Sequence, residues 1–284
     1  MSLNYLSWRG LTRVGLVATL ALFTSALQAG AEVRFAPERD YAPFVFQASN
    51  GEVQGLSVDL LEVLKPALSV TIVTLPAQPL NEILQAAQRG QVDLISSLRP
   101  TPERAAYLAF TAPYVQVPAV LVVRQSISPP RLEDLDGQAV AVGRGYAVES
   151  YVRQHFGRVR WQAVPDDLSG LRGLMQGRYQ GVVADVASVS DAIRRHQVEG
   201  VQVVHTIGFD YPLSFAYRKD LPQLGQQLEA ALQQVSPQTR QKIVDRWIDA
   251  QTLQFEDPKR ILLRRVALAL ALLGVALLIN RRRT

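Results

Sequence analysis

The sequence of 284 residues contains no cysteine. That absence excludes a disulfide framework, a thiol nucleophile and a thiolate metal site. Only three histidines are present, and they are not spaced like metal ligands. No G-x-S-x-G motif occurs, and GRGYAVES at 143–150 lacks the third glycine of a dinucleotide-binding fingerprint. We therefore expect neither a metal nor a cofactor, and a fold held together by its apolar core alone.

An excess of positive charge is also missing from the main part of the chain, although the whole sequence has a formal charge of +5. All 25 acidic residues lie between 32 and 257, together with only 21 of the 30 basic residues, which leaves this part at −4. The other basic residues stand in the two tails. A basic surface for nucleic acid has no support, so no nucleic-acid partner is expected.

The two ends of the chain are typical of membrane-related segments. Residues 1–31 carry two arginines, then an apolar run, then small residues, which predicts a signal peptide cleaved after residue 31; an uncleaved anchor is the alternative. Residues 266–279 are uninterruptedly apolar, and this run spans about 21 Å as a helix. It crosses a hydrocarbon core of ~30 Å only if residues 261–263 join it.

From these ends we expect a periplasmic domain anchored in the inner (cytoplasmic) membrane by a C-terminal helix. Residues 251–260 would be a linker, 261–280 the transmembrane helix and 281–284 a cytoplasmic tail. Basic residues flank the apolar run on both sides, so charge orients it weakly. Export of the preceding domain decides the orientation instead.

Between the ends, short β-branched runs alternate with amphipathic segments in two series. The first series contains predicted strands and helices at 33–37, 57–64, 70–75, 80–90 and 92–97. Two prolines at 129–130 mark a boundary, and a second βα series fills 138–195. The pattern predicts an α/β fold with two lobes, each a mostly parallel sheet flanked by helices. The cleft between two such lobes is a preferred place for a small ligand.

One stretch, SSLRPTPERAAYLAFTAPY at 96–114, combines a predicted helix start with an arginine. Thr, Pro and Glu at 101–103 favour a helix N-terminus, yet Arg104 follows, where a cation opposes the helix dipole by ~0.3–1 kcal/mol. A bound anion would account for Arg104, because the serine hydroxyls, free backbone amides and the guanidinium would all meet it. The alternative is an arginine paired with a structural acid, Glu103 or Asp93.

Asp185 holds the matching position in the second series, at the end of the predicted strand 181–185. An aspartate placed there commonly caps the following helix. If it faces a cleft, it can instead accept hydrogen bonds from an ammonium group. The residues alone leave both roles open.

The middle of the chain contains four strings in a fixed order: YAPFVF with GLSVDLL, GQVDLISSLRPTPERAAYLAFTAPY, GRYQGVVADVASV and LPQLGQQLEAALQQVSPQTRQKIVDRWI. Together they resemble the type II extracellular (periplasmic) solute-binding proteins, family 3, over about residues 33–247. That family includes polar amino-acid receptors of ABC importers and periplasmic sensor domains of some kinases. The resemblance implies a two-lobed periplasmic-binding-protein, or Venus-flytrap, fold that closes on a small ligand.

The resemblance also implies roles for individual residues. Arg104 would bind the α-carboxylate of the ligand, and Asp185 its α-ammonium group. Ser97 would contribute a hydroxyl or an amide, and Tyr41 would pack an aromatic face against the ligand side chain. Glu38 matches a position that reads a basic side chain in some members.

Three departures from the family pattern concern the choice of ligand. Arg99 stands where amino-acid receptors often carry a serine. Tyr146 and Ala147 stand where lobe 2 often offers threonine hydroxyls to the carboxylate, and Leu80 replaces a common aromatic wall. Arg99 directed into the cleft would favour an acidic amino acid or a dicarboxylate, whereas Arg99 directed outward would indicate nothing. The full set of candidate ligand-binding residues is Glu38, Tyr41, Leu80, Ser96, Ser97, Arg99, Arg104, Tyr146 and Asp185.

We expect lobe 1 to comprise 32–122 and 206–250, and lobe 2 to comprise 123–205. The predicted membrane helix favours the sensory input of a signalling system. The substrate-binding component of an amino-acid ABC importer, which would bind a permease, is the alternative, and an enzyme on the same fold, dehydratase-like, is a minor one. The sequence leaves open whether a signalling partner is needed or whether the chain is a piece of a longer sensor.

Overall fold

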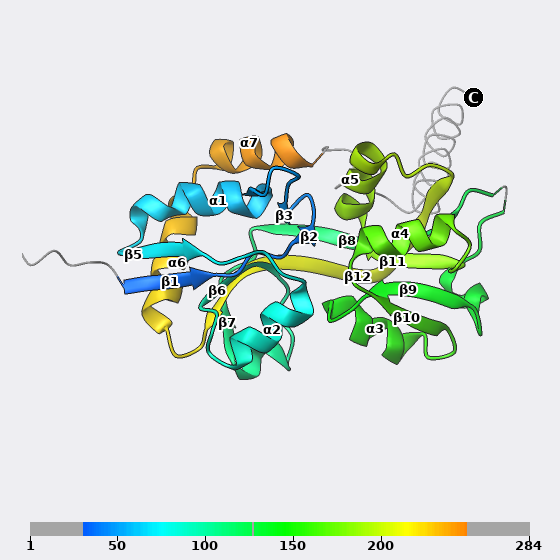
Figure 1. Ribbon diagram of the computed structural model, residues 1–284, viewed down its shortest axis with the longest axis horizontal. Helices are drawn as coiled ribbons and strands as arrows, with labels where there is room; N and C mark the ends of the chain where they lie inside the picture. The colour runs from blue at the N-terminus through cyan, green and yellow to red at the C-terminus, as the bar shows by residue number, and fades with distance from the viewer. Residues whose placement is uncertain (1–30, 127, 249–284) are drawn as a thin grey trace, which may run out of the picture.

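The computed structural model describes residues 31–126 and 128–248. Figure 1 shows two lobes side by side, connected by two long strands that run through both. The predicted signal peptide lies outside the described residues except for Ala31, the first residue of β1 (Ala31–Phe35). The predicted linker, transmembrane helix and cytoplasmic tail lie wholly outside them. Within the described ranges, no helix is long and apolar enough to cross a membrane.

Lobe 1 contains a parallel three-stranded core. β1 lies between β5 (Val70–Thr74) and β6 (Leu94–Leu98) and is parallel to both. The helical elements of this lobe are α1 (Leu56–Leu64), η1 (Lys65–Ala67), α2 (Leu80–Gln88), α6 (Pro222–Gln234) and α7 (Pro237–Trp247). A small antiparallel sheet is formed by β2 (Asp40–Tyr41), β3 (Val45–Gln47) and β4 (Val53–Gln54). The predicted strands and helices of the first series are confirmed up to residue 98.

Lobe 2 repeats the parallel arrangement. β9 (Ala139–Gly143) lies between β10 (Arg160–Val164) and β11 (Gly181–Asp185). Every residue of β9 and β11 is buried, as expected for parallel strands covered on both faces. The helical elements of this lobe are η3 (Leu132–Leu135), α3 (Ala147–His155), α4 (Asp167–Met175) and α5 (Val186–His196).

Two long strands join the lobes. β8 (Val115–Arg124) and β12 (Val201–Arg218) pair antiparallel with each other, and β12 continues along β6 and β7 (Leu108–Phe110) in lobe 1. The expected lobe boundaries at 122/123 and 205/206 fall inside these strands. The sheet is therefore mixed rather than mostly parallel, because a strand that crosses between lobes runs against the βα strands it meets: β8 pairs antiparallel with β11.

The predicted helix after Pro102 is wrong. The chain forms only a three-residue 3₁₀ turn, η2 (Arg104–Ala106), before β7 begins at Leu108. β7 pairs with β12, so the sheet leaves room for a single turn between β6 and β7. The helix-dipole argument therefore does not apply to Arg104, whose position has to be explained by its own contacts.

Asp93 just before β6 serves the fold rather than Arg104. Its buried carboxylate accepts hydrogen bonds from Nε of Arg34 at 2.7 Å and from Nη2 of Arg34 at 2.8 Å. Arg218 on β12 adds a further contact at 3.2 Å. These contacts lower the pKa of Asp93 against the effect of its burial, and they tie β12 to the parallel core of lobe 1.

Candidate ligand-binding site

A small cavity between the lobes brings together most of the predicted site residues. Its volume is about 20 Å³, enough for about one water molecule. The predicted residues that line it are Glu38, Tyr41, Leu80, Ser97, Arg99, Arg104 and Tyr146. We call this space the cleft cavity. Ser96 and Asp185 do not line it.

The strand β12 contributes further lining residues that the sequence analysis missed, although the sequence contains a signal for them. Phe209, Tyr211 and Leu213 alternate along β12 and are all buried, so the period of two places them on one face of the strand. Tyr211 and Leu213 line the cleft cavity. The hydroxyl of Tyr211 has no hydrogen-bond partner in the described part of the chain.

Arg104 is a buried cation at the boundary between the lobes. Its side chain is only 5 % exposed. Nη1 donates to the backbone oxygen of Arg99 at 2.7 Å in lobe 1, and Nη2 donates to the oxygen of Gly145 at 2.8 Å in lobe 2. It forms no ion pair with any described residue, so the alternative of a structural acid, Glu103 or Asp93, is not supported. Burial lowers the pKa of Arg104, and the charge of Glu38 opposes that shift, but no described acid lies within ion-pair distance of the guanidinium.

Ser97 has a strained backbone that its neighbours hold in place. Its φ of 57° lies in the left-handed region, which a serine rarely adopts. The Ser97 amide donates to the hydroxyl of Tyr114 at 2.7 Å, and its Oγ lies 2.7 Å from Oγ of Ser57. Such strain commonly occurs at functional sites, where the surroundings fix one conformation.

Glu38 and Tyr146 form a direct hydrogen bond between the lobes. The Tyr146 hydroxyl donates to Oε1 of Glu38 at 2.7 Å, and its ring packs against Tyr41 at a centroid distance of 5.5 Å. Burial raises the pKa of Glu38 to about 8, although the Tyr146 hydrogen bond and the charge of Arg104 oppose the shift. Tyr146 thus fills part of the space between the lobes and supplies the Glu38 carboxyl with a donor.

Arg99 is a half-buried residue that lines the cleft cavity. Its guanidinium lies 3.7 Å from the centroid of the Phe209 ring, a cation–π distance. Nη1 is buried without a hydrogen-bond partner among the described residues. Burial lowers the pKa of Arg99. Two arginine residues, Arg99 and Arg104, therefore line the same small space.

Asp185 caps the helix that follows it. Oδ1 accepts from the Ser188 amide at 2.8 Å and Oδ2 from the Ser188 hydroxyl at 2.7 Å, at the N-terminus of α5. Burial raises the pKa of Asp185 to about 6, while hydrogen bonds from Ser188 and Tyr41 oppose that shift. The capping role, which the sequence left open, is confirmed. Ser96, on strand β6, is buried away from the cavity, and its Oγ has no partner in the described ranges.

No group of three or more His, Cys, Asp or Glu side chains in the described residues is placed to hold a metal ion. Side chains that can bind an organic anion line the cleft cavity. Arginine can grip a carboxylate through two parallel hydrogen bonds, and both Arg99 and Arg104 line this cavity. Hydroxyls of Ser97, Tyr146 and Tyr211 add donors and acceptors nearby.

Comparison with known proteins agrees with this architecture. The chain is 27% identical over 237 residues to "ABC transporter arginine-binding protein 1" of Escherichia coli (strain K12). That alignment covers 82% of this chain and 97% of the other protein. It is 23% identical over 211 residues to "Virulence sensor protein BvgS" of Bordetella bronchiseptica, covering 73% of this chain but 17% of that sensor.

The fold also matches a solved structure, "An ancestral arginine-binding protein bound to arginine", with a TM-score of 0.70 and 26% identity. That match covers 77% of this chain and 99% of the other. By name these three are binding or sensor proteins. The family model described as "Bacterial extracellular solute-binding proteins, family 3" matches residues 33–250. The chain therefore belongs to the bacterial extracellular solute-binding proteins, family 3.

Proposed function

We propose that this protein is a receptor domain that binds a small amino-acid-like or carboxylate ligand between its two lobes. The observation that carries the proposal is Arg104, a residue 5 % exposed whose guanidinium donates to backbone oxygens of both lobes and forms no ion pair with a described residue. A buried cation without an anion is costly for a fold to keep. A ligand carboxylate would supply the missing charge.

Ligand binding requires the contacts between the lobes to change. The cleft cavity holds about one water. The Arg104 guanidinium is already hydrogen-bonded to the Gly145 oxygen, and the Glu38 carboxyl to the Tyr146 hydroxyl. A ligand must therefore separate the lobes or turn the Tyr146 side chain aside. The ligand would then replace the Gly145 oxygen with its carboxylate, and closure would be favoured by contacts made to both lobes at once.

In this proposal Arg104 and Ser97 bind the ligand carboxylate, and Tyr41 packs against the ligand. Asp185, which now caps α5 and does not line the cleft cavity, would accept from the ligand ammonium once the lobes rearrange around the ligand. Arg99 is the specific departure, because it also lines the cavity and would bring a second positive charge to it. That charge favours a ligand with a second anionic group, such as an acidic amino acid or a dicarboxylate.

In the cell we propose a periplasmic domain tethered to the inner membrane by the predicted helix at 261–280, acting as the sensory input of a signalling system. The substrate-binding component of an amino-acid ABC importer is the second candidate. Similarity to an arginine-binding transporter protein and to a virulence sensor supports both. The two are distinguished in cells that lack the gene: loss of ligand uptake supports the importer, and unchanged uptake with altered gene expression supports the sensor.

The binding proposal is tested by calorimetric titration of the full chain with single amino acids and dicarboxylates. We expect at least one to bind and be recovered unchanged, and we expect Arg104→Ala and Asp185→Ala each to weaken it by ~2–5 kcal/mol, since each removes one partner of a buried charge pair. Arg89→Ala, at an exposed arginine of lobe 1, is the matched control and should bind normally. A ligand whose affinity survives Arg104→Ala would refute the site assignment.

A further inference from the structure

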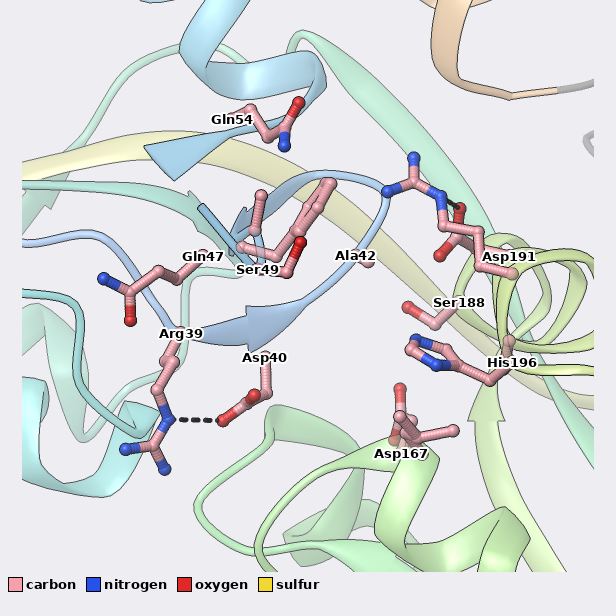
Figure 2. Close-up of a pocket in the computed structure, with 15 residues that line it drawn as sticks. Arg39, Asp40, Ala42, Gln47, Ser49, Gln54, Asp167, Ser188, Asp191 and His196 are labelled. Atoms are coloured by element: carbon pink, nitrogen blue, oxygen red, sulfur yellow. Dashed lines mark hydrogen bonds and ion pairs between the residues drawn. The ribbon is translucent and has the colours of Figure 1, made fainter. Parts of the chain in front are cut away.

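A second and larger cavity also lies between the lobes. Its volume is about 360 Å³, and it shares no lining residue with the cleft cavity. One wall comes from the small sheet β2–β3–β4 of lobe 1, and the opposite wall comes from α4 and α5 of lobe 2 (Figure 2). We call it the α5 cavity.

The α5 cavity contains an unpaired buried acid. Asp167, the first residue of α4, is 4 % exposed. Neither of its carboxylate oxygens has a hydrogen-bond partner within the described ranges. Figure 2 shows Asp167 at the cavity beside Ser188 and His196. An isolated carboxylate in such a place is destabilising unless a cation or a proton joins it.

The arginines that line the α5 cavity are already paired. Nε of Arg39 lies 2.9 Å from Asp40, and Nε of Arg195 lies 2.8 Å from Asp191. Each arginine is thus neutralised by its own acid, and neither contacts Asp167. The cavity therefore has one acid more than its arginines balance, and His196 is the remaining titratable residue of the lining.

The size and lining of the α5 cavity select an organic cation over a bare metal ion. No metal-holding group of acids and histidines is found in the described residues. The volume lies in the range of small-molecule pockets. Apolar side chains of Ala42, Leu168 and Ala192 alternate with amide and hydroxyl groups of Gln47 and Ser49.

We propose that the α5 cavity binds an organic cation, an ammonium or guanidinium group on a short carbon chain, with Asp167 as its counter-ion. The two cavities share no lining residue, and the ligand of the α5 cavity needs no carboxylate and no contact with Arg104. Asp185 lies next to the α5 cavity, since it accepts from the lining residue Ser188 and its charge acts on Asp167. A cation held there would touch both lobes and so stabilise the arrangement in which they meet. The second site would make the closed state depend on two ligands of opposite charge.

The test is a calorimetric titration of the full chain with agmatine and with putrescine, two organic cations that lack a carboxylate. We expect one or both to bind, and Asp167→Asn to weaken binding about tenfold or more, which equals about 1.4 kcal/mol. Arg104→Ala should leave the affinity unchanged within about twofold, as should Asp136→Asn, at an exposed acid of lobe 2 outside the cavity.

The melting temperature separates a binding role of Asp167 from a structural one. Without added cation, Asp167→Asn should melt at the same temperature as the unmodified chain or higher, because it removes an unpaired buried charge while keeping the side-chain shape. Absence of binding by both cations, equal affinity in Asp167→Asn, or loss of binding in Arg104→Ala would each overturn the proposal. A lower melting temperature in Asp167→Asn would also overturn it, since it would assign Asp167 to the fold.

Discussion

Replacing Glu38 with glutamine should flatten the pH dependence of stability. Glu38 is 5 % exposed, and burial raises its pKa from 4.5 to about 8. A pKa difference of this size between the unfolded and folded states corresponds to at most about 5 kcal/mol of folding free energy. The glutamine would keep the shape of the side chain, and its amide oxygen can still accept from the Tyr146 hydroxyl that now donates to Oε1 of Glu38.

The sign of the effect follows from where the proton is bound. Below about pH 4.5 both states of the chain hold the proton on Glu38, and the carboxyl costs nothing. As the pH rises toward 8, the unfolded chain releases that proton while the folded chain keeps it, so the free energy of unfolding falls. Above about pH 8 both states are ionised, and no further stability is lost through this group.

The assay is urea unfolding of the full chain, followed by circular dichroism at several values between about pH 5 and pH 8. As the pH rises across this window, the free energy of unfolding of Glu38→Gln should fall by a few kcal/mol less than that of the unmodified chain. The other titrating groups are the same in both, so the difference reports Glu38 alone. Glu62→Gln, on exposed α1 surface, is the matched control. If the stability of Glu38→Gln falls as steeply with pH as that of the unmodified chain, Glu38 is not the buried, protonated group that the geometry indicates.

Two further substitutions test the fold of lobe 1 by the same urea unfolding at a single pH. Asp93→Asn should destabilise it by ~3–5 kcal/mol, because it leaves two arginines without their buried acid; a loss under about 1 kcal/mol would mean that solvent already screens these pairs. Gly55→Ala should cost roughly 2–4 kcal/mol, because φ is 134° and the new Cβ would stand 2.4 Å from a backbone oxygen. Gly51→Ala, with a φ of 86° but open space around it, should cost clearly less; equal losses would attribute the Gly55 effect to φ alone.

Most of the fold could be predicted from periodicity, and the exceptions have a common cause. The helices at 57–64 and 80–90 and the strand 181–185 are confirmed because each buries its own apolar face. The antiparallel course of β8 and β12 could not be read locally, because strand direction depends on partners far away in the sequence. The predicted helix at Arg104 is absent for the same reason. Residues 101–103 favour a helix N-terminus locally, but β7 pairs with the distant strand β12, so only one 3₁₀ turn forms before β7.

The candidate site was predicted in part. Family resemblance identified Arg104 and Glu38, and the structure places both beside the cleft cavity. The contact between Arg99 and the ring of Phe209 could not be inferred from sequence, because Phe209 lies on β12, far from Arg99 along the chain. Asp167 carries no sequence signal at all, since an acid in the first turn of a helix is ordinary. Only its burial and its lack of partners distinguish it.

The interleaved course of the two crossing strands also determines the order in which the protein can be assembled. β6 pairs with β12 through Leu98 and Ser214, so this edge of lobe 1 stays open while all of lobe 2 is synthesised or exported between them. The β9–β10–β11 core of lobe 2 comes from one unbroken stretch and can form earlier. Folding of lobe 1 then waits for a contact of long sequence separation, which makes it the slower step. The lobe that carries Arg104 is therefore expected to be the last to fold.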